Sequence, residues 1–149
     1  MSDDSLVQPI VAGFMDAWNR HDPAAFAALF APDADFTNAA GVTTHGRDKI
    51  QALHTRVFSK RFKDSHETAD QVAVRWLTPD IAAVDVRWTL TGVRDETGAE
   101  RPPRNGILSL IVARSANQWA IQVVHTLDLK QPDAGGHDAP PPPAGTSAD

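Results

Sequence analysis

Residues 71–91, QVAVRWLTPDIAAVDVRWTLT, contain two runs in which apolar and polar side chains alternate. The runs, residues 71–77 and 81–91, are rich in Val, Trp and Thr, a composition typical of half-buried strands. Residues 78–80, Thr-Pro-Asp, lie between them, and the fixed φ of Pro suits a tight turn. This segment therefore predicts a β-hairpin with one apolar face, and other parts of the chain must pack against that face.

Further long strands are predicted after this hairpin. A polar loop over residues 94–104 leads to a strand over residues 105–113, and a turn leads to a strand over residues 119–129, which together extend the hairpin into an antiparallel meander. The last two strands are apolar in both phases, with Ile107 and Ile111 in one and Leu108, Leu110 and Val112 in the other. Because a sheet with two apolar faces needs two covers, we expect a second subunit on the face without helices.

A helix is predicted near the start of the chain, because apolar residues recur at helical spacing over residues 6–18. The sequence leaves two starts open. One is a capping box formed by Ser5 and Gln8, and the other places Pro9 in the first turn, where its missing N–H has no cost.

Two more helices and two short strands are predicted before the hairpin. The second helix begins at Pro23 with Asp22 as its N-cap and ends at residues 32–33, Pro-Asp. The remaining elements are short strands over residues 34–38 and 42–45 and a third helix from Arg47 to about Phe62.

The composition is that of one ordinary globular domain and argues against several partner classes. The 149 residues, 42% of them hydrophobic, suffice for one core and a small-molecule pocket. With 14 Lys and Arg against 19 Asp and Glu, the formal charge is −5, and no basic face is concentrated. This pattern argues against a nucleic-acid or an anionic-membrane partner. The chain contains neither Cys nor Tyr.

The domain is expected to span residues 1–129. From Lys130 the sequence is rich in Pro, Gly and Ala and poor in large apolar side chains, so residues 130–149 are expected to form a flexible tail. Polar residues, Pro9 and Gly13 interrupt the first apolar stretch, so neither a signal peptide nor a membrane span is predicted. We therefore expect a cytoplasmic location.

Several motifs occur in a fixed order, namely Phe14-x3-Trp18-Asn19-x2-Asp22, Leu29-Phe30-Ala31-Pro32-Asp33-Ala34-Asp35-Phe36-x-Asn38, Gly41, Gly46-Arg47-x2-Ile50 and Trp119-x-Ile121-x3-His125. This series resembles the NTF2-like superfamily and, within it, the SnoaL-like proteins grouped as the SgcJ/EcaC family, over about residues 6–129. The resemblance implies an α+β, cone-shaped barrel: a strongly curved, mostly antiparallel sheet with three helices over its concave face, a pocket between them and usually a homodimer through the sheet. Because the superfamily includes isomerases, cyclases, dehydratases, epoxide hydrolases and non-catalytic proteins, the fold does not identify a reaction.

His125 is the candidate catalytic residue. It lies in phase with Ile121 and Val123, so we expect it to face an apolar side, where partial desolvation would suit an imidazole to proton transfer. The resemblance also implies that this position faces the pocket. The alternative is a core histidine bonded to a backbone carbonyl. The other predicted pocket residues are Phe14, Trp18, Phe36, Asn38, His54, Trp76 and Trp88, and for His54 and the two Trp on the strands an ordinary place in the core is the alternative.

Other chemistries have less support. The resemblance to steroid isomerases implies a carboxylate base where this chain has Asn38, and an amide takes up no proton at neutral pH. Asp85, Arg87 and Asp128 resemble the Asp–Arg–Asp set of limonene-epoxide-hydrolase-like proteins, but strand phase favours a cross-strand salt bridge with Arg75. The six His show no metal-ligand spacing and no cofactor motif is visible, so neither a metal nor a cofactor is expected.

Two functional hypotheses follow. In the first, the chain is a homodimer whose pocket binds a small hydrophobic or polyketide-like molecule, with Asn38 and His125 as polar anchors. Acid/base catalysis of the isomerase, cyclase or hydrolase type by His125 extends this hypothesis. In the second, the chain is a non-catalytic dimerisation module whose cavity is filled by side chains. The volume of the cavity distinguishes the two.

Overall fold

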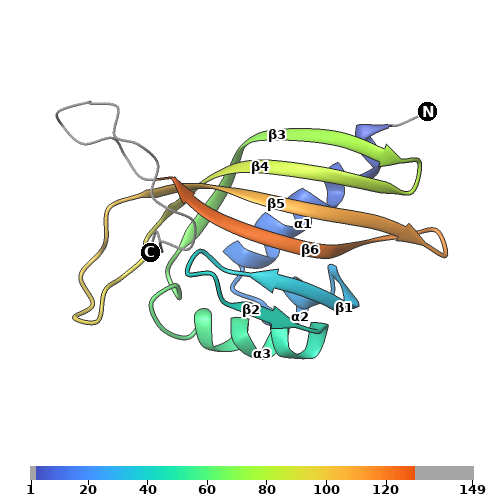
Figure 1. Cartoon of the computed structure of the whole chain (residues 1–149). Helices are drawn as coiled ribbons and strands as arrows, with labels where there is room; N and C mark the ends of the chain where they lie inside the picture. Colours follow the sequence, from blue (N-terminus) through green and yellow to red (C-terminus); the bar gives the residue numbers. More distant parts are fainter. Residues whose placement is uncertain (1–2, 130–149) are drawn as a thin grey trace.

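One strongly curved, six-stranded sheet runs through the computed structural model, which describes residues 3–129 (Figure 1). Its strands follow the order β2-β1-β6-β5-β4-β3, and β1 with β6 is the parallel pair. The strands are β1 (Phe30–Thr37), β2 (Thr43–His45), β3 (His66–Thr78), β4 (Ile81–Thr91), β5 (Arg104–Ser115) and β6 (Gln118–Leu129). The helices are a short 3-10 helix, η1 (Asp4–Leu6), and α1 (Gln8–Asn19), α2 (Pro23–Ala27) and α3 (Arg47–Val57).

The helices cover the concave face of the sheet (Figure 1). The hydrophobic core lies between the two layers, and Phe26, Phe30, Trp88 and Ile121 are among its fully buried side chains. The predicted α+β class is thus confirmed. The predicted barrel needs a correction, because within residues 3–129 no strand joins the edge strands β2 and β3. β2 is only three residues long and α3 follows it directly, so the sheet stays open.

The predicted hairpin is formed by β3 and β4, and β5 and β6 extend it as expected. β4 has the predicted bounds, whereas β3 begins at His66, before the predicted Gln71. The additional residues of β3 pair with the last residues of β4, and Glu67 lies opposite Leu90. A long-range partner therefore extends this strand beyond its own apolar alternation.

The second helix is shorter than predicted. Asp22 caps it as expected, with Oδ1 accepting a hydrogen bond from the backbone N–H of Ala25 at 3.0 Å. It ends at Ala27, and Pro32, predicted to end it, lies inside β1. The register of β1 against β6 is irregular between Phe30 and Asp35, so Pro32 lies where a regular ladder bond is not required.

The first helix begins with Pro9 in its first turn, and the capping box is not formed. Its N-cap is Val7, without a side-chain hydrogen bond, and η1 precedes it. The third helix ends at Val57 rather than near Phe62. Just beyond it, the hydroxyl of Ser59 donates to the carbonyl of Arg56 at 2.9 Å, a local bond that competes with continuation of the helix.

Two of the one-residue bulges in the sheet set the phase of the strands that line the concave face. In β3, Ala69 is paired with Trp88 and Gln71 with Arg87, so Asp70 is the additional residue. In β6, Val123 and Ile121 are paired with consecutive residues of β5, so Gln122 is additional. Because side chains alternate with a period of two, each bulge moves the residues beyond it to the opposite face.

No helix among residues 3–129 is long and apolar enough to span a membrane. The predicted tail, residues 130–149, lies outside the described residues.

Gly106 is expected to be intolerant of any side chain. A Cβ at this position would overlap the indole ring of Trp88 and the carbonyl oxygen of Leu127 on the neighbouring strand. We expect Gly106→Ala to lower the free energy of unfolding by about 2–3 kcal/mol, measured by urea denaturation. Gly41→Ala is the control, because its φ is +83° but nothing lies within 4 Å of the added Cβ. A loss at Gly106 no larger than that at Gly41 would contradict the overlap.

Candidate functional site

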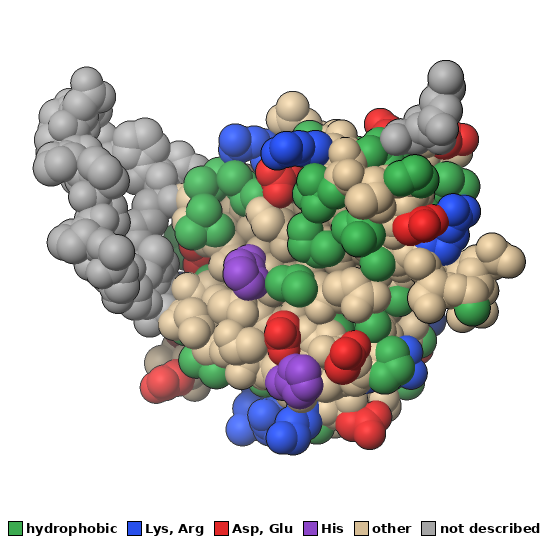
Figure 2. Space-filling view, turned by 45° about the vertical axis from the view of Figure 1, so that its right-hand side comes forward, with side chains coloured by type: hydrophobic (Ala, Val, Ile, Leu, Met, Phe, Trp, Pro, Cys, Tyr) green, Lys and Arg blue, Asp and Glu red, His purple; other side chains and the backbone are tan. Residues whose placement is uncertain are grey.

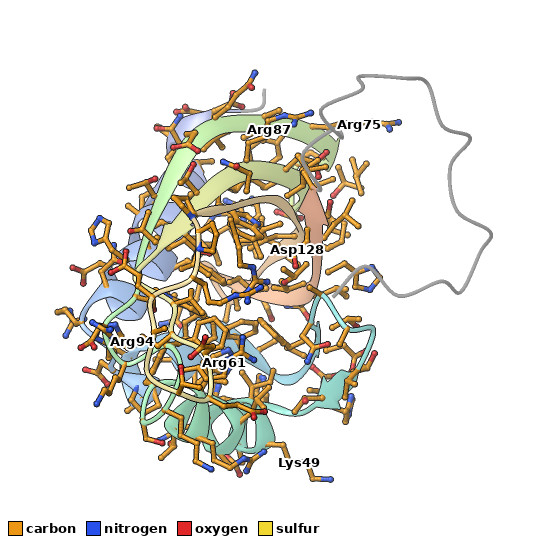
Figure 3. The ribbon with its side chains drawn as sticks, turned by 90° about the vertical axis from the view of Figure 1, so that its left-hand side faces the viewer. Lys49, Arg61, Arg75, Arg87, Arg94 and Asp128 are labelled. Carbon is orange, nitrogen blue, oxygen red and sulfur yellow. The ribbon has the colours of Figure 1, made fainter. Side chains whose placement is uncertain are left out.

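A cavity of about 690 Å³ lies between the helices and the concave face of the sheet. Its walls are mainly apolar and include Phe14, Trp18, Phe36, Leu53, Trp88 and Leu108. Exposed lining residues mark its mouth, among them Arg61 after α3, and Arg101 and Pro102 in the loop before β5. Figure 3 faces this end of the molecule, with Asp128 on the sheet side and Arg61 on the helix side.

Six of the eight predicted pocket residues line this cavity: Phe14, Trp18, Phe36, Asn38, His54 and Trp88. Trp76 does not. It lies near the β3–β4 turn, packs edge-on against Trp119 at a centroid distance of 5.5 Å and donates its indole N–H to Asp4 at 3.0 Å. The strand face was predicted correctly, but Trp76 is too near the opposite end of the sheet to reach the cavity.

His125 does not line the cavity, and the prediction that it faces an apolar side is wrong. The bulge at Gln122 puts it out of phase with buried Ile121, so its side chain is exposed on the outer face of the sheet. It lies opposite Ser109, whose hydroxyl donates to Asp85 at 2.8 Å. A catalytic role for His125 therefore has no support from its position.

The Asp–Arg–Asp set is not assembled either. Asp85 and Arg87 are exposed on the outer face, whereas Asp128 lines the cavity. The predicted salt bridge with Arg75 is also absent from the ion pairs of residues 3–129, because Asp85 accepts its hydrogen bond from Ser109 instead.

Asn38 lines the cavity, but its side-chain oxygen is already used. Oδ1 accepts hydrogen bonds from the backbone N–H groups of Ala40 and Val42, each at 3.0 Å. These bonds hold the turn between β1 and β2. The main contribution of Asn38 is thus to shape one side of the mouth.

Glu67 is the polar group that sequence reasoning missed. Its side chain lines the cavity, the residue is only 5% exposed, and Oε1 has no hydrogen-bond partner among residues 3–129. Burial raises the pKa of this carboxyl to about 8, against the opposing effect of the positive charge of Arg104. The bulge at Asp70 is the reason that the sequence pattern did not indicate Glu67. If side chains simply alternated along β3 from Val74 and Val72 toward its start, Glu67 would lie on the outer face.

Asn19 holds the backbone of Glu67 from both sides. Its Nδ2 donates to the carbonyl of Glu67 at 2.9 Å, and its Oδ1 accepts from the N–H of Glu67 at 2.7 Å. Next to it, Trp18 donates its indole N–H to the hydroxyl of Ser65 at 3.0 Å. The Trp-Asn pair at the end of α1 thereby fixes the start of β3 against the helix layer.

An ion pair and an indole N–H also line the same cavity. Arg104 donates from Nη2 to both oxygens of Asp128, at 2.9 and 2.8 Å, which makes a partly buried ion pair. Trp88 lies over Gly106, and its Nε1 is buried with no hydrogen-bond partner in the described part of the chain. A buried N–H without a partner costs about 1–3 kcal/mol, so this group would gain from an acceptor on a bound molecule.

His54 is a neutral part of the cavity wall. It is 2% exposed, and its Nδ1 lies 2.8 Å from the carbonyl of Ile50, which can only accept, so Nδ1 carries the proton. Burial lowers the pKa of the ring to about 4, against the opposing effect of this bond. Its ring packs 4.2 Å from Phe26 and 4.9 Å from Phe36, between centroids. These contacts favour the wall histidine over the catalytic one.

Within the described part of the chain, no group of three or more His, Asp or Glu side chains is arranged to hold a metal ion. The polar groups of the inner wall are the carboxyl of Glu67, whose pKa burial raises, the indole N–H of Trp88 and the Arg104–Asp128 ion pair. All of them lie among apolar walls.

Comparison with known proteins finds a family match. The model of a family described as SnoaL-like domain matches residues 11–131. No curated protein matches the sequence.

Solved structures share the fold. An uncharacterized protein with a cystatin-like fold from Caulobacter vibrioides is 26% identical, with 89% of this chain and 92% of that chain covered and a TM-score of 0.80. An NTF2-like superfamily protein from Salmonella enterica serovar Typhimurium is 20% identical, with 91% and 99% covered and a TM-score of 0.75. Hexachlorocyclohexane dehydrochlorinase LinA-type3 from Novosphingobium barchaimii is 16% identical, with 93% and 94% covered and a TM-score of 0.78.

The two buried titratable groups are expected to give opposite pH dependences of stability. Folded Glu67 keeps its proton up to about pH 8, against an ordinary pKa of 4.5, so its contribution falls as pH rises between these values. Folded His54 loses its proton near pH 4, against an ordinary 6.5, so its contribution rises over that interval. Between pH 4.5 and 6.5 the rise in stability due to His54 offsets the fall due to Glu67. Above pH 6.5 only the fall in stability due to Glu67 remains.

Glu67→Gln is the variant that tests this expectation by urea denaturation across pH 4–8. The wild type should lose roughly 1.4 kcal/mol of unfolding free energy per pH unit above pH 6.5. The variant should lose this decline and show the rise due to His54 at lower pH. A variant with the same decline as the wild type would show that Glu67 is ionised in the folded protein.

Proposed function

Because the chain belongs to the SnoaL-like domain family, we propose that it binds a small, largely apolar organic molecule in the cavity between its helices and sheet. The observation that carries this proposal is the cavity itself, about 690 Å³ with mainly apolar walls. Small-molecule sites typically have roughly 300–1,000 Å³, apolar walls and a few polar groups. The competing hypothesis, a dimerisation module with a filled cavity, does not account for this volume.

Two further observations support a ligand. Glu67 Oε1 and Trp88 Nε1 are buried in the cavity wall without partners among the described residues, and such groups are costly unless a bound molecule pairs with them. One neighbour of the same fold is named as a dehydrochlorinase of hexachlorocyclohexane, which is a small apolar molecule. At 16% identity that likeness concerns the fold, so the reaction is not transferred.

Three expectations from the sequence stay predictions. They are membership of the SgcJ/EcaC family, a polyketide-like ligand and a cytoplasmic location.

Blocking the cavity tests the proposal. We expect Leu53→Trp, on the cavity side of α3, to weaken binding of the neutral apolar dye N-phenyl-1-naphthylamine by about tenfold or more, since the indole occupies ligand volume. Leu77→Trp is the matched control, because Leu77 is 47% exposed and does not line the cavity. Fluorescence titration measures both. Equal binding by the two variants, or none by the wild type, would contradict the proposal.

We also propose that the chain forms a homodimer through the outer face of the sheet. This face carries Leu127, which is 52% exposed, opposite Ile107, and half-buried Val123 opposite Ile111. Figure 2 shows hydrophobic side chains gathered on the upper part of this face, above a more polar region. No helix covers the outer face within the described residues, and a second copy would remove these apolar side chains from water.

Sedimentation velocity tests the dimer. We expect the wild type to sediment as a dimer and Leu127→Asp as a monomer, because the new carboxylate would be desolvated in the interface without a partner. Leu6→Asp introduces the same charge at an exposed leucine of η1, on the helix side of the sheet, and should stay dimeric. A monomeric wild type, or a dimeric Leu127→Asp variant, would exclude this interface.

A further inference from the structure

A polar row crosses the inner wall of the cavity. Glu67 lies opposite Leu90, and Leu90 lies opposite Arg104, so one row spans β3, β4 and β5. Arg104 already has a charge partner, since both oxygens of Asp128 accept from it. Glu67 has no such partner within residues 3–129, although it is the more deeply buried acid. It is therefore the group of this row that is left for a bound molecule.

The charges around the cavity restrict what Glu67 can bind. The lining of the cavity contains three basic residues, Arg61, Arg101 and Arg104, and two acidic residues, Glu67 and Asp128. With Asp128 paired to Arg104, the two arginines at the mouth leave the cavity positive, which disfavours a cationic ligand. A carboxylate ligand beside Glu67 would bury a full charge among mainly apolar walls, where Arg104 is already paired with Asp128, which is also unfavourable. A neutral ligand remains.

We propose that Glu67 is a neutral hydrogen-bond donor that binds the carbonyl oxygen of an uncharged, apolar ligand such as a ketone, an aldehyde or an ester. This inference rests on the proposed function, because it assigns the ligand class of the same cavity. A carboxyl in its acid form has an O–H to donate, and an unpartnered buried one is stabilised by an acceptor. The raised pKa of Glu67 agrees with the acid form at neutral pH.

Trp88 supports the same ligand class. Its Nε1 is a donor only, is buried in the cavity wall and has no partner among the residues that the structure describes. Trp88 lies two residues before Leu90 on β4, so it is the diagonal cross-strand neighbour of Glu67. Both unpaired groups of this wall are thus suited to an acceptor on the ligand. The hydrogen bonds of Asn19 to the backbone of Glu67 hold the strand that carries the donor.

A pair of probes that differ at one atom tests the proposal. The carbonyl oxygen of 2-acetylnaphthalene is replaced by a CH₂ group in 2-isopropenylnaphthalene, with almost the same shape. Both are titrated by calorimetry at pH 6.5 into wild type, Glu67→Leu and Glu67→Gln. The amide of Gln keeps a neutral donor, whereas Leu keeps only the volume. Circular dichroism and N-phenyl-1-naphthylamine binding confirm that each variant is folded with an open cavity.

We expect Glu67→Leu to weaken binding of the ketone by about tenfold and to leave the hydrocarbon unchanged or tighter, and Glu67→Gln to keep most of the ketone affinity. If the ratio of the two affinities is the same in wild type and Glu67→Leu, the donor role is overturned while cavity binding stands. If the Gln variant loses as much ketone affinity as the Leu variant, the donor role is likewise overturned. If the wild type binds neither probe and also fails to bind the dye, the proposed function itself fails.

Discussion

The arrangement of polar groups in the cavity depends on two bulges, at Asp70 in β3 and at Gln122 in β6. A strand exposes alternate residues to its two faces, so one additional residue reverses the orientation of everything beyond it. Without the first bulge Glu67 would face outward, and without the second Asp128 would leave Arg104 unpaired. Val124, which is fully buried beyond the second bulge, would change face as well, so the bulges determine part of the core together with the chemistry of the site.

This dependence explains what the sequence could and could not predict. The order of helices and strands, the N-cap Asp22 and the inward side of α1, with Phe14 and Trp18, follow from periodicity and local chemistry, which are properties of short segments. The orientations of Glu67 and His125 do not follow from periodicity, because a bulge is defined by the register between two paired strands and not by the residue pattern of one strand. The ends of α2 and α3 were misjudged for a related reason. Strand pairing and a local hydroxyl bond there override helix periodicity.

The buried titratable groups carry little net charge, although the whole chain is acidic. The formal charge is −5, but burial favours the neutral forms of both Glu67 and His54. The same physical cause, loss of hydration, moves the two pKa values in opposite directions, upward for the acid and downward for the base. The remaining charges of the inner wall, Arg104 and Asp128, neutralise each other. Polarity on the inner wall of the cavity thus takes the form of directed hydrogen-bonding groups, and the unbalanced positive charge lies with Arg61 and Arg101 at the mouth.

The open sheet has one further consequence. Its edge strand β3 is thirteen residues long, and within the described residues it pairs along one side only, with β4 (Figure 1). A long free edge is a template for pairing with another chain, which leads to aggregation. The bulge at Asp70 interrupts this edge near its middle, and exposed charged side chains, Asp70 and Arg75, lie along it. The irregularity that turns Glu67 into the cavity therefore also protects the protein from growing by β-strand addition.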